Sequence, residues 1–282
     1  MLYSGGLYFG GNRYKSRYAD ASFATWFLRT IVFTIMAAAS VNTATYTDEK
    51  PIPTTFGVLL FPGFQALDVF GPIDVLNTLA LSKKLNLYII AETLDPVTTK
   101  IAAINTSPEF SESIVPTHTF DTVPPLDFLL VPGGLGTQAP GLDPTRDFVK
   151  NIYPSLKYLM TVCTGSALIA PTGLLDGRRA TGNKKIWAWV TSQGPNVNWV
   201  AQARWVVDGN IWTSSGIAAG MDAMYAFVGY IWGEEQSKDL AMTLEYERHT
   251  DADWDPFAEY WGATWPLTPG AGGGNGGAGA GG

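Results

Sequence analysis

The chain has 282 residues, a formal net charge of −7 at pH 7 and a hydrophobic content of 46%. This acidic balance, with no basic stripe in the central part of the chain, argues against nucleic acid as a partner. The single cysteine, Cys163, excludes an intramolecular disulfide and an all-cysteine metal site. Charged residues make up only 15%, which favours a surface that is buried between subunits.

The first 50 residues differ in composition from the rest. Basic residues precede a short apolar run at 31–40 that ends in small residues. About ten apolar residues are too few for a stable membrane span, which takes ~20. The pattern favours a secretory signal. A mitochondrial transit peptide is one alternative, and an over-extended gene start in front of a cytoplasmic protein is another.

We divide the chain into a targeting or disordered segment at 1–50, a folded domain at 51–269 and a flexible Gly-rich tail at 270–282. Within the domain, apolar runs alternate with helical patterns. The runs predict strands at 55–61, 86–92, 126–131 and 158–162, and a weaker extended segment at 97–103. Helices are expected from about Gly71-Pro72, at 143–153, at 166–170, around Trp187 and Trp189, at 216–232 and at 234–247. Residues 199–206 and 210–214 predict a hairpin around Asp208-Gly209. The alternation indicates an α/β fold with a mostly parallel sheet that helices cover on both faces.

Cys163 lies at the junction of a strand and a helix, in the sequence Val-Cys-Thr-Gly-Ser. A sharp turn of this kind resembles the nucleophile elbow of α/β hydrolases. The free N–H groups and partial positive charge of a helix N-terminus favour a thiolate, so we expect the pKa of Cys163 to be depressed. The alternative is an inert cysteine buried in the core.

Two other features follow the ends of predicted strands. Asp68 comes after the first strand, and Gly133-Gly134 follow the strand at 126–131. Because open α/β sheets bind ligands at the carboxyl ends of their strands, we expect Asp68 and Cys163 to converge on one edge. Backbone N–H groups of paired glycines stabilise developing negative charge, although such glycines also form plain turns.

Four stretches, in order, carry a family resemblance: FGVLLFPGFQALDVFGPIDVL, DFLLVPGG, VCTGSALIAPTGLLDGRRATGN and WVVDGNIWTSSGIAAGMDAMYAFV. Together they resemble the ThiJ/PfpI superfamily, whose fold is similar to class I glutamine amidotransferases and to a flavodoxin-like three-layer sandwich. Within the superfamily the chain is most similar to isonitrile hydratase-like proteins, which are lyases. The resemblance implies a small-molecule substrate, a homodimer, and no metal or organic cofactor.

The resemblance also implies site residues. Cys163 corresponds to the nucleophile, followed by Thr164, and Asp68 to the acid that works with it. Gly133 and Gly134 are expected to position substrate and stabilise charge. Asn183 stands where bacterial relatives commonly have histidine, which weakens a peptidase-like Cys–His mechanism. The two histidines of the chain, His118 and His249, do not follow a predicted strand end.

In isonitrile hydratase-like chemistry the cysteine adds to an isonitrile and water releases an N-substituted formamide. We expect Phe64, Phe70 and the helix after Gly216 to line the pocket. Glyoxalase-type chemistry on 2-oxoaldehydes and a non-enzymatic role in redox sensing or stress response are the alternatives. The segment after Glu247 is acidic and then Gly-rich, which disfavours the DNA-binding domain of related transcription regulators.

Overall fold

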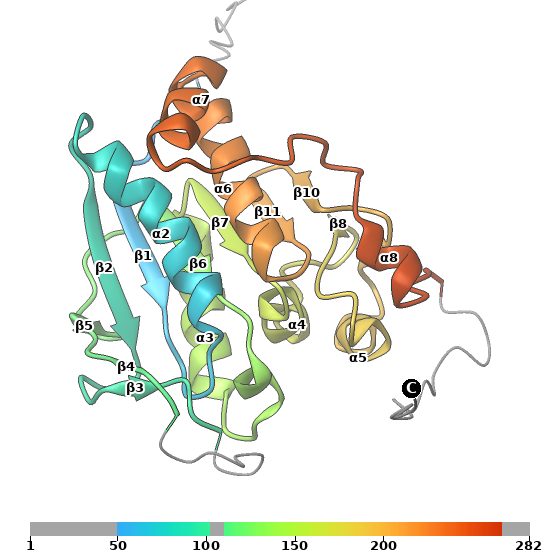
Figure 1. Cartoon of the computed structure of the whole chain (residues 1–282). Helices are drawn as coiled ribbons and strands as arrows, with labels where there is room; N and C mark the ends of the chain where they lie inside the picture. Colours follow the sequence, from blue (N-terminus) through green and yellow to red (C-terminus); the bar gives the residue numbers. More distant parts are fainter. Residues whose placement is uncertain (1–49, 102–109, 267–282) are drawn as a thin grey trace, which may run out of the picture. The chain divides into compact units, whose positions relative to one another are not determined.

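The computed structural model describes residues 50–101 and 110–266. Within these ranges seven strands form the central sheet, in the order β10-β11-β7-β6-β1-β2-β5 (Figure 1). The strands are β1 (Thr55–Leu59), β2 (Asn86–Ala91), β5 (His118–Thr119), β6 (Phe128–Val131), β7 (Tyr158–Thr161), β10 (Trp205–Asp208) and β11 (Ile211–Ser214). Every pairing is parallel except that of β10 with β11. The predicted mostly parallel sheet is confirmed.

The three central strands β1, β6 and β7 are almost wholly buried. Strands that are covered on both faces read as continuous apolar runs, which is why the sequence reveals them. Four two-residue strands pair outside the central sheet. They are β3 (Val97–Thr98) with β4 (Ser113–Ile114), and β8 (Arg179–Ala180) with β9 (Asn198–Trp199).

Two groups of helices flank the sheet (Figure 1). In one group α2 packs against α6 and α6 against α7, whereas in the other α3 contacts α4 and α4 contacts α5. The α-helices are α2 (Ala66–Ala80), α3 (Asp143–Ile152), α4 (Gly165–Ile169), α5 (Trp187–Ser192), α6 (Ile217–Trp232), α7 (Glu234–Thr243) and α8 (Pro256–Tyr260). Short 3-10 helices are η1 (Leu135–Gln138), η2 (Tyr153–Ser155) and η3 (Ala170–Thr172). None of the described helices is both long and apolar enough to cross a bilayer.

Helix α2 begins at Ala66, earlier than the start near Gly71-Pro72 that the sequence predicts. Pro72 lies inside the helix. A proline in the second turn removes one backbone hydrogen bond, the one that would reach the carbonyl of Asp68 four residues earlier. Packing of the buried face, which includes Val69 and Ile73, outweighs that loss. The helix start therefore places Asp68 in its first turn.

Other predicted boundaries also differ. The strand expected at 199–206 is divided: Trp199 belongs to β9, and Trp205 and Val206 begin β10. The hairpin pairs β10 with β11, and Gly209 in its turn has a φ of 60°. The extended segment at 97–103 contributes only β3, and its end lies outside the described residues. Helix α8 is not predicted at all. The predictions for 1–49 and 270–282 fall outside the described residues.

Candidate active site

Cys163 occupies the turn between β7 and α4. Its φ of 60° lies in the left-handed region, where among the described non-glycine residues only Glu245 joins it. Backbone strain of this kind persists only where the surroundings impose it. The Cys163 N–H donates to the carbonyl of Ser215 over 2.8 Å, and the Cys163 carbonyl accepts from the N–H of Asn183 over 3.1 Å. The sharp turn predicted from the sequence is confirmed.

The pKa expected for Cys163 is wrong in direction. Cys163 is only 6% exposed, and burial together with the charge of Asp68 raises its pKa to about 12. Hydrogen bonds from Asn183 and Thr164 lower the pKa but do not offset burial. Desolvation of the sulfur therefore exceeds the stabilisation that a short helix supplies.

Asp68 lies beside Cys163 and is itself fully buried. Its Oδ2 accepts a hydrogen bond from the N–H of Gly133 over 2.9 Å. Its Oδ1 makes no hydrogen bond within the described part of the chain. Burial raises the pKa of Asp68 to about 7, and interactions with Gly133 and Cys163 offset part of that rise. The two side chains meet at the carboxyl ends of β1 and β7, and their joint role in a reaction stays a prediction.

Gly133 and Gly134 bring a second loop against the elbow. A Cβ at Gly133 would lie 2.5 Å from the Thr164 nitrogen, so only glycine fits there. The N–H of Gly134 donates to Thr164 Oγ1 over 2.9 Å, and Thr137 Oγ1 donates to the same atom over 3.0 Å. The N–H groups of both glycines are thus bonded to Asp68 and Thr164, which holds these side chains in place. The role predicted for the glycines toward substrate stays a prediction.

Asn183 hydrogen-bonds to the sulfur of Cys163, and it stands at the position where a histidine was expected from bacterial relatives. Its Nδ2 donates to Cys163 Sγ over 3.2 Å, and its Oδ1 accepts from the N–H of Ile186 over 3.3 Å. A side-chain amide orients the sulfur but does not exchange a proton near neutral pH. His118 bonds to Thr117, and His249 packs on Trp254, so neither histidine contacts the elbow.

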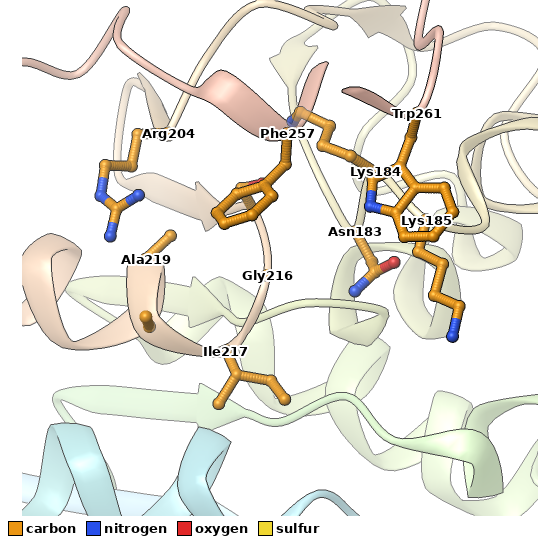
Figure 2. A pocket seen from close by; sticks show the side chains of 11 residues that line it. Asn183, Lys184, Lys185, Arg204, Gly216, Ile217, Ala219, Phe257 and Trp261 are labelled. Atoms are coloured by element: carbon orange, nitrogen blue, oxygen red, sulfur yellow. The ribbon is translucent and has the colours of Figure 1, made fainter. Parts of the chain in front are cut away.

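A pocket of about 270 Å³ opens next to the elbow, with Asn183 on its wall (Figure 2). The start of α6 lines it, as predicted for the helix after Gly216. The predicted aromatic walls are wrong, because Phe64 is 2% exposed in the core and Phe70 faces a separate cavity. The aromatic side chains of this pocket are Phe257 and Trp261, in and just after α8.

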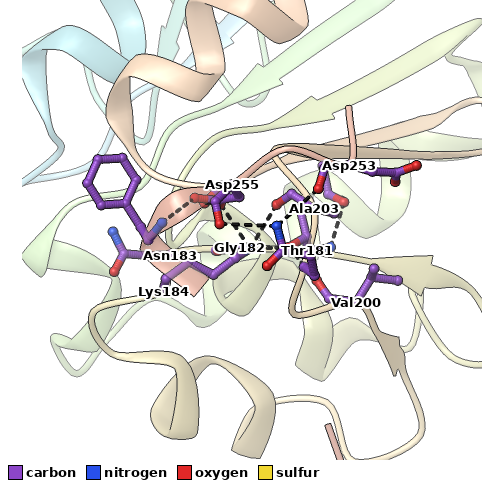
Figure 3. A network of polar contacts seen from close by, with 12 residues as sticks. Thr181, Gly182, Asn183, Lys184, Val200, Ala203, Asp253 and Asp255 are labelled. Atoms are coloured by element: carbon purple, nitrogen blue, oxygen red, sulfur yellow. Dashed lines mark hydrogen bonds and ion pairs between the residues drawn. The ribbon is translucent and has the colours of Figure 1, made fainter. Parts of the chain in front are cut away.

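A buried ion pair that no sequence pattern predicted lies behind the pocket. Lys184 Nζ lies 3.6 Å from Asp255 Oδ2 and donates to the carbonyls of Gly182 and Ala203 and to the hydroxyl of Thr181 (Figure 3). Burial lowers the pKa of Lys184 to about 8, and the charge of Asp255 offsets part of this effect. The only sequence signal was a lysine directly after Asn183.

The described residues contain no group of three or more His, Cys, Asp or Glu side chains placed to hold a metal ion.

The sequence pattern of the DJ-1/PfpI family matches residues 56–229. The chain belongs to the DJ-1/PfpI family. This confirms the resemblance to ThiJ/PfpI proteins.

Curated and solved relatives agree with this assignment. Isonitrile hydratase of Pseudomonas putida is 34% identical over 192 residues, which are 67% of this chain and 77% of that protein. The HTH-type transcriptional regulator GbdR of Pseudomonas aeruginosa is 33% identical over 138 residues, 48% of this chain and 36% of the regulator. A crystal structure of a ThiJ/PfpI family protein from Pseudomonas syringae superposes with a TM-score of 0.60 at 29% identity, covering 71% of this chain and 78% of that one.

Within this DJ-1/PfpI protein, the elbow and one wall of the pocket come from different parts of the chain. Asp68, Cys163 and Asn183 fall inside the matched residues 56–229. Asp255, Phe257 and the rest of α8 lie after them. These three side chains thus come from the part of the chain that matches the family, whereas one wall of the neighbouring pocket comes from a segment outside the match.

Proposed function

We propose that this DJ-1/PfpI protein is an isonitrile hydratase, which adds water to R–N≡C and releases an N-substituted formamide. One observation carries the proposal: the buried carboxyl of Asp68, with its pKa raised to about 7, lies beside the elbow thiol of Cys163. An acid that is half protonated near neutral pH gives and takes a proton with equal ease. The activity of the Pseudomonas putida relative supports the same conclusion.

In the first step the isonitrile carbon takes a proton from protonated Asp68 while the sulfur of Cys163 bonds to that carbon. The thiol proton returns to the Asp68 carboxylate. The product is a thioimidate, R–N=CH–S–Cys163, and the net change is addition of S–H across the carbon. Hydrogen bonds to the sulfur from Asn183 and Thr164 stabilise its charge as the thiol proton leaves.

In the second step Asp68, which is protonated at the end of the first, gives its proton to the thioimidate nitrogen, and its carboxylate then takes a proton from the water molecule that attacks the carbon. The tetrahedral adduct R–NH–CH(OH)–S–Cys163 forms. The C–S bond then breaks as the hydroxyl proton passes through Asp68 to the sulfur, and R–NH–CHO leaves. One oxygen of the formamide therefore comes from water, and the chain is left unchanged.

The same geometry disfavours the two alternatives. Attack on a 2-oxoaldehyde creates an oxyanion, yet the N–H groups of Gly133 and Gly134 already bond Asp68 and Thr164. The isonitrile carbon needs a proton rather than an oxyanion site. A redox sensor needs an exposed thiol of low pKa. Cys163 is buried and its pKa is raised.

The test assays the purified full chain against benzyl isonitrile and methylglyoxal in water enriched in ¹⁸O. We expect N-benzylformamide with one heavy oxygen, and no turnover of methylglyoxal. Cys163→Ala should abolish formamide production, and Asp68→Asn should slow it by ~10²–10⁴-fold. Turnover of methylglyoxal without turnover of the isonitrile, or retained activity in Cys163→Ala, contradicts the proposal.

A further inference from the structure

The segment after α7 runs along the pocket side of the domain and is bonded to it at several points. We refer to residues 249–266 as the C-terminal arm. The backbone N–H of Arg204 donates to the carbonyl of Ala252 over 2.7 Å, and Gln202 Nε2 donates to the carbonyl of Asp253 over 3.0 Å. Trp187 Nε1 donates to the carbonyl of Thr264 over 2.8 Å. The arm is thus held against the domain from near its start to near its end.

Asp255 anchors the arm at the elbow. It is 1% exposed and pairs with Lys184 (Figure 3). It also accepts a hydrogen bond from Ser215 Oγ. Its Oδ1 also accepts from the N–H of Phe257 over 3.0 Å, which caps α8. The carbonyl of Ser215 accepts the N–H of Cys163. Ser215 therefore links Asp255, which anchors the arm, to the backbone of Cys163.

The arm places two aromatic side chains over the pocket. Phe257 is 52% exposed and Trp261 is 45% exposed, and both lie on the pocket wall (Figure 2). Across from them are the backbone of Gly216 and the side chain of Ile217, at the start of α6. Asn183 lies between this space and Cys163, because it lines the pocket and bonds to the sulfur. A group in the pocket is one side chain away from the reacting atom.

The charges at the pocket are already paired or lie at its edge. Lys184 pairs with Asp255, and Arg204 pairs with Asp222 over 2.6 Å. Lys185 is exposed, with its Nζ 5.7 Å from the ring centroid of Trp261. Paired buried charges do not attract a charged ligand, so the pocket suits a neutral, apolar group.

The pocket is also larger than the smallest isonitriles need. Its volume of about 270 Å³ lies just below the range of roughly 300–1,000 Å³ that small-molecule sites in proteins usually have. A methyl group leaves most of that space unfilled, whereas a benzyl group fills more of it.

We propose that the C-terminal arm supplies the specificity pocket for the substrate's R group, with Phe257 and Trp261 selecting bulky apolar groups of benzyl size. This inference rests on the proposed hydratase function. It adds a substrate class and assigns a binding role to a segment outside the family match.

The experiment compares kcat/KM for benzyl and methyl isonitrile in the full chain. Phe257→Ala and Trp261→Ala should each lower the value for benzyl isonitrile roughly five- to thirtyfold, through KM, and leave methyl isonitrile unchanged. Tyr260→Ala is the matched control for Phe257→Ala, since this aromatic residue of α8 is 75% exposed, does not line the pocket and packs its ring against Trp261 rather than Phe257. Equal losses for both substrates, or losses as large in Tyr260→Ala, overturn the inference.

A binding measurement separates this inference from the proposed function. N-benzylformamide is titrated by calorimetry into the Cys163→Ala variant, which has no nucleophile. We expect binding that Phe257→Ala weakens and Tyr260→Ala does not. If the wild-type chain turns over no isonitrile but Phe257→Ala still weakens binding while Tyr260→Ala does not, the hydratase function is wrong and the assignment of the binding pocket is supported. If N-benzylformamide does not bind, or binds equally to all variants, the pocket assignment is wrong.

Discussion

Asn183 Nδ2 donates a hydrogen bond to Cys163 Sγ over 3.2 Å. A donor aimed at sulfur favours the thiolate. The buried thiol nevertheless keeps its proton, because burial and the charge of Asp68 raise its pKa to about 12. The resting site therefore holds a neutral thiol beside a carboxyl whose pKa is raised to about 7. In the proposed mechanism, proton transfer between these two groups, rather than a preformed thiolate, activates the sulfur.

The first prediction concerns the reactivity of Cys163. Iodoacetamide should alkylate it at pH 7.5 more slowly than it alkylates an unfolded cysteine peptide, whose pKa is about 8.5. The rate should still be rising at pH 10, because the pKa of Cys163 is about 12. Mass spectrometry of the intact chain measures the rate without ambiguity, since Cys163 is the only cysteine. A plateau below pH 8 would show a depressed pKa and contradict this prediction.

The second prediction isolates the bond from Asn183. Asn183→Leu keeps similar bulk and removes the donor, so it should raise the pKa of Cys163 further. The alkylation rate at pH 9 should fall roughly tenfold, in line with a hydrogen bond to a charged group. Asn196→Leu is the control, because Asn196 is exposed and bonds to Asp176 away from the elbow. An unchanged rate in Asn183→Leu would mean that the bond does not stabilise the thiolate.

The third prediction is a pH dependence of stability that comes from Asp68. Between about pH 4 and pH 7 the unfolded chain loses the Asp68 proton while the folded chain keeps it. The free energy of unfolding should therefore fall as pH rises through this window. A rise of the pKa from 3.8 to about 7 corresponds to roughly 4 kcal/mol.

Asp68→Asn removes this titration while its amide oxygen can still accept from the N–H of Gly133. The variant should be more stable than wild type at pH 8 by up to about 4 kcal/mol, and the difference should shrink toward pH 4. Urea unfolding at pH 4.5, 6 and 8 gives the comparison. A stability difference that does not change with pH would show that Asp68 ionises normally in the folded chain.

The fourth prediction concerns the buried pair behind the pocket. Lys184→Met leaves Asp255 buried without its cation, so the free energy of unfolding should fall by about 3–5 kcal/mol. Lys185→Met changes the neighbouring, exposed lysine and should cost less than about 0.5 kcal/mol. Urea unfolding of both variants at pH 7 tests the difference. Equal stability of the two variants would mean that the pair does not hold the arm.

Most of the strands and helices, in their order along the chain, and the position of the elbow were accessible from the sequence, whereas β5 and α8 were not. Buried strands such as β1 and β7 are continuous apolar runs, and the small residues after Val162 mark a turn too tight for most side chains. These are local properties, set by side-chain character and by the allowed backbone angles. The match of residues 56–229 to the DJ-1/PfpI family agrees with that local pattern.

The electrostatics of the site and the walls of its pocket depended on the tertiary structure. The helix N-terminus near Cys163 was visible in the sequence, but the depth of burial that overrides it was not. In the sequence, Asn183 indicated only that the expected histidine is absent. The tertiary structure shows that its side-chain amide hydrogen-bonds to the sulfur of Cys163. Phe257 and Asp255 are far from Cys163 along the chain, and no local pattern links them to it. Desolvation and long-range packing depend on what folds over a residue, so only the complete chain sets the pKa of Cys163 and the shape of its pocket.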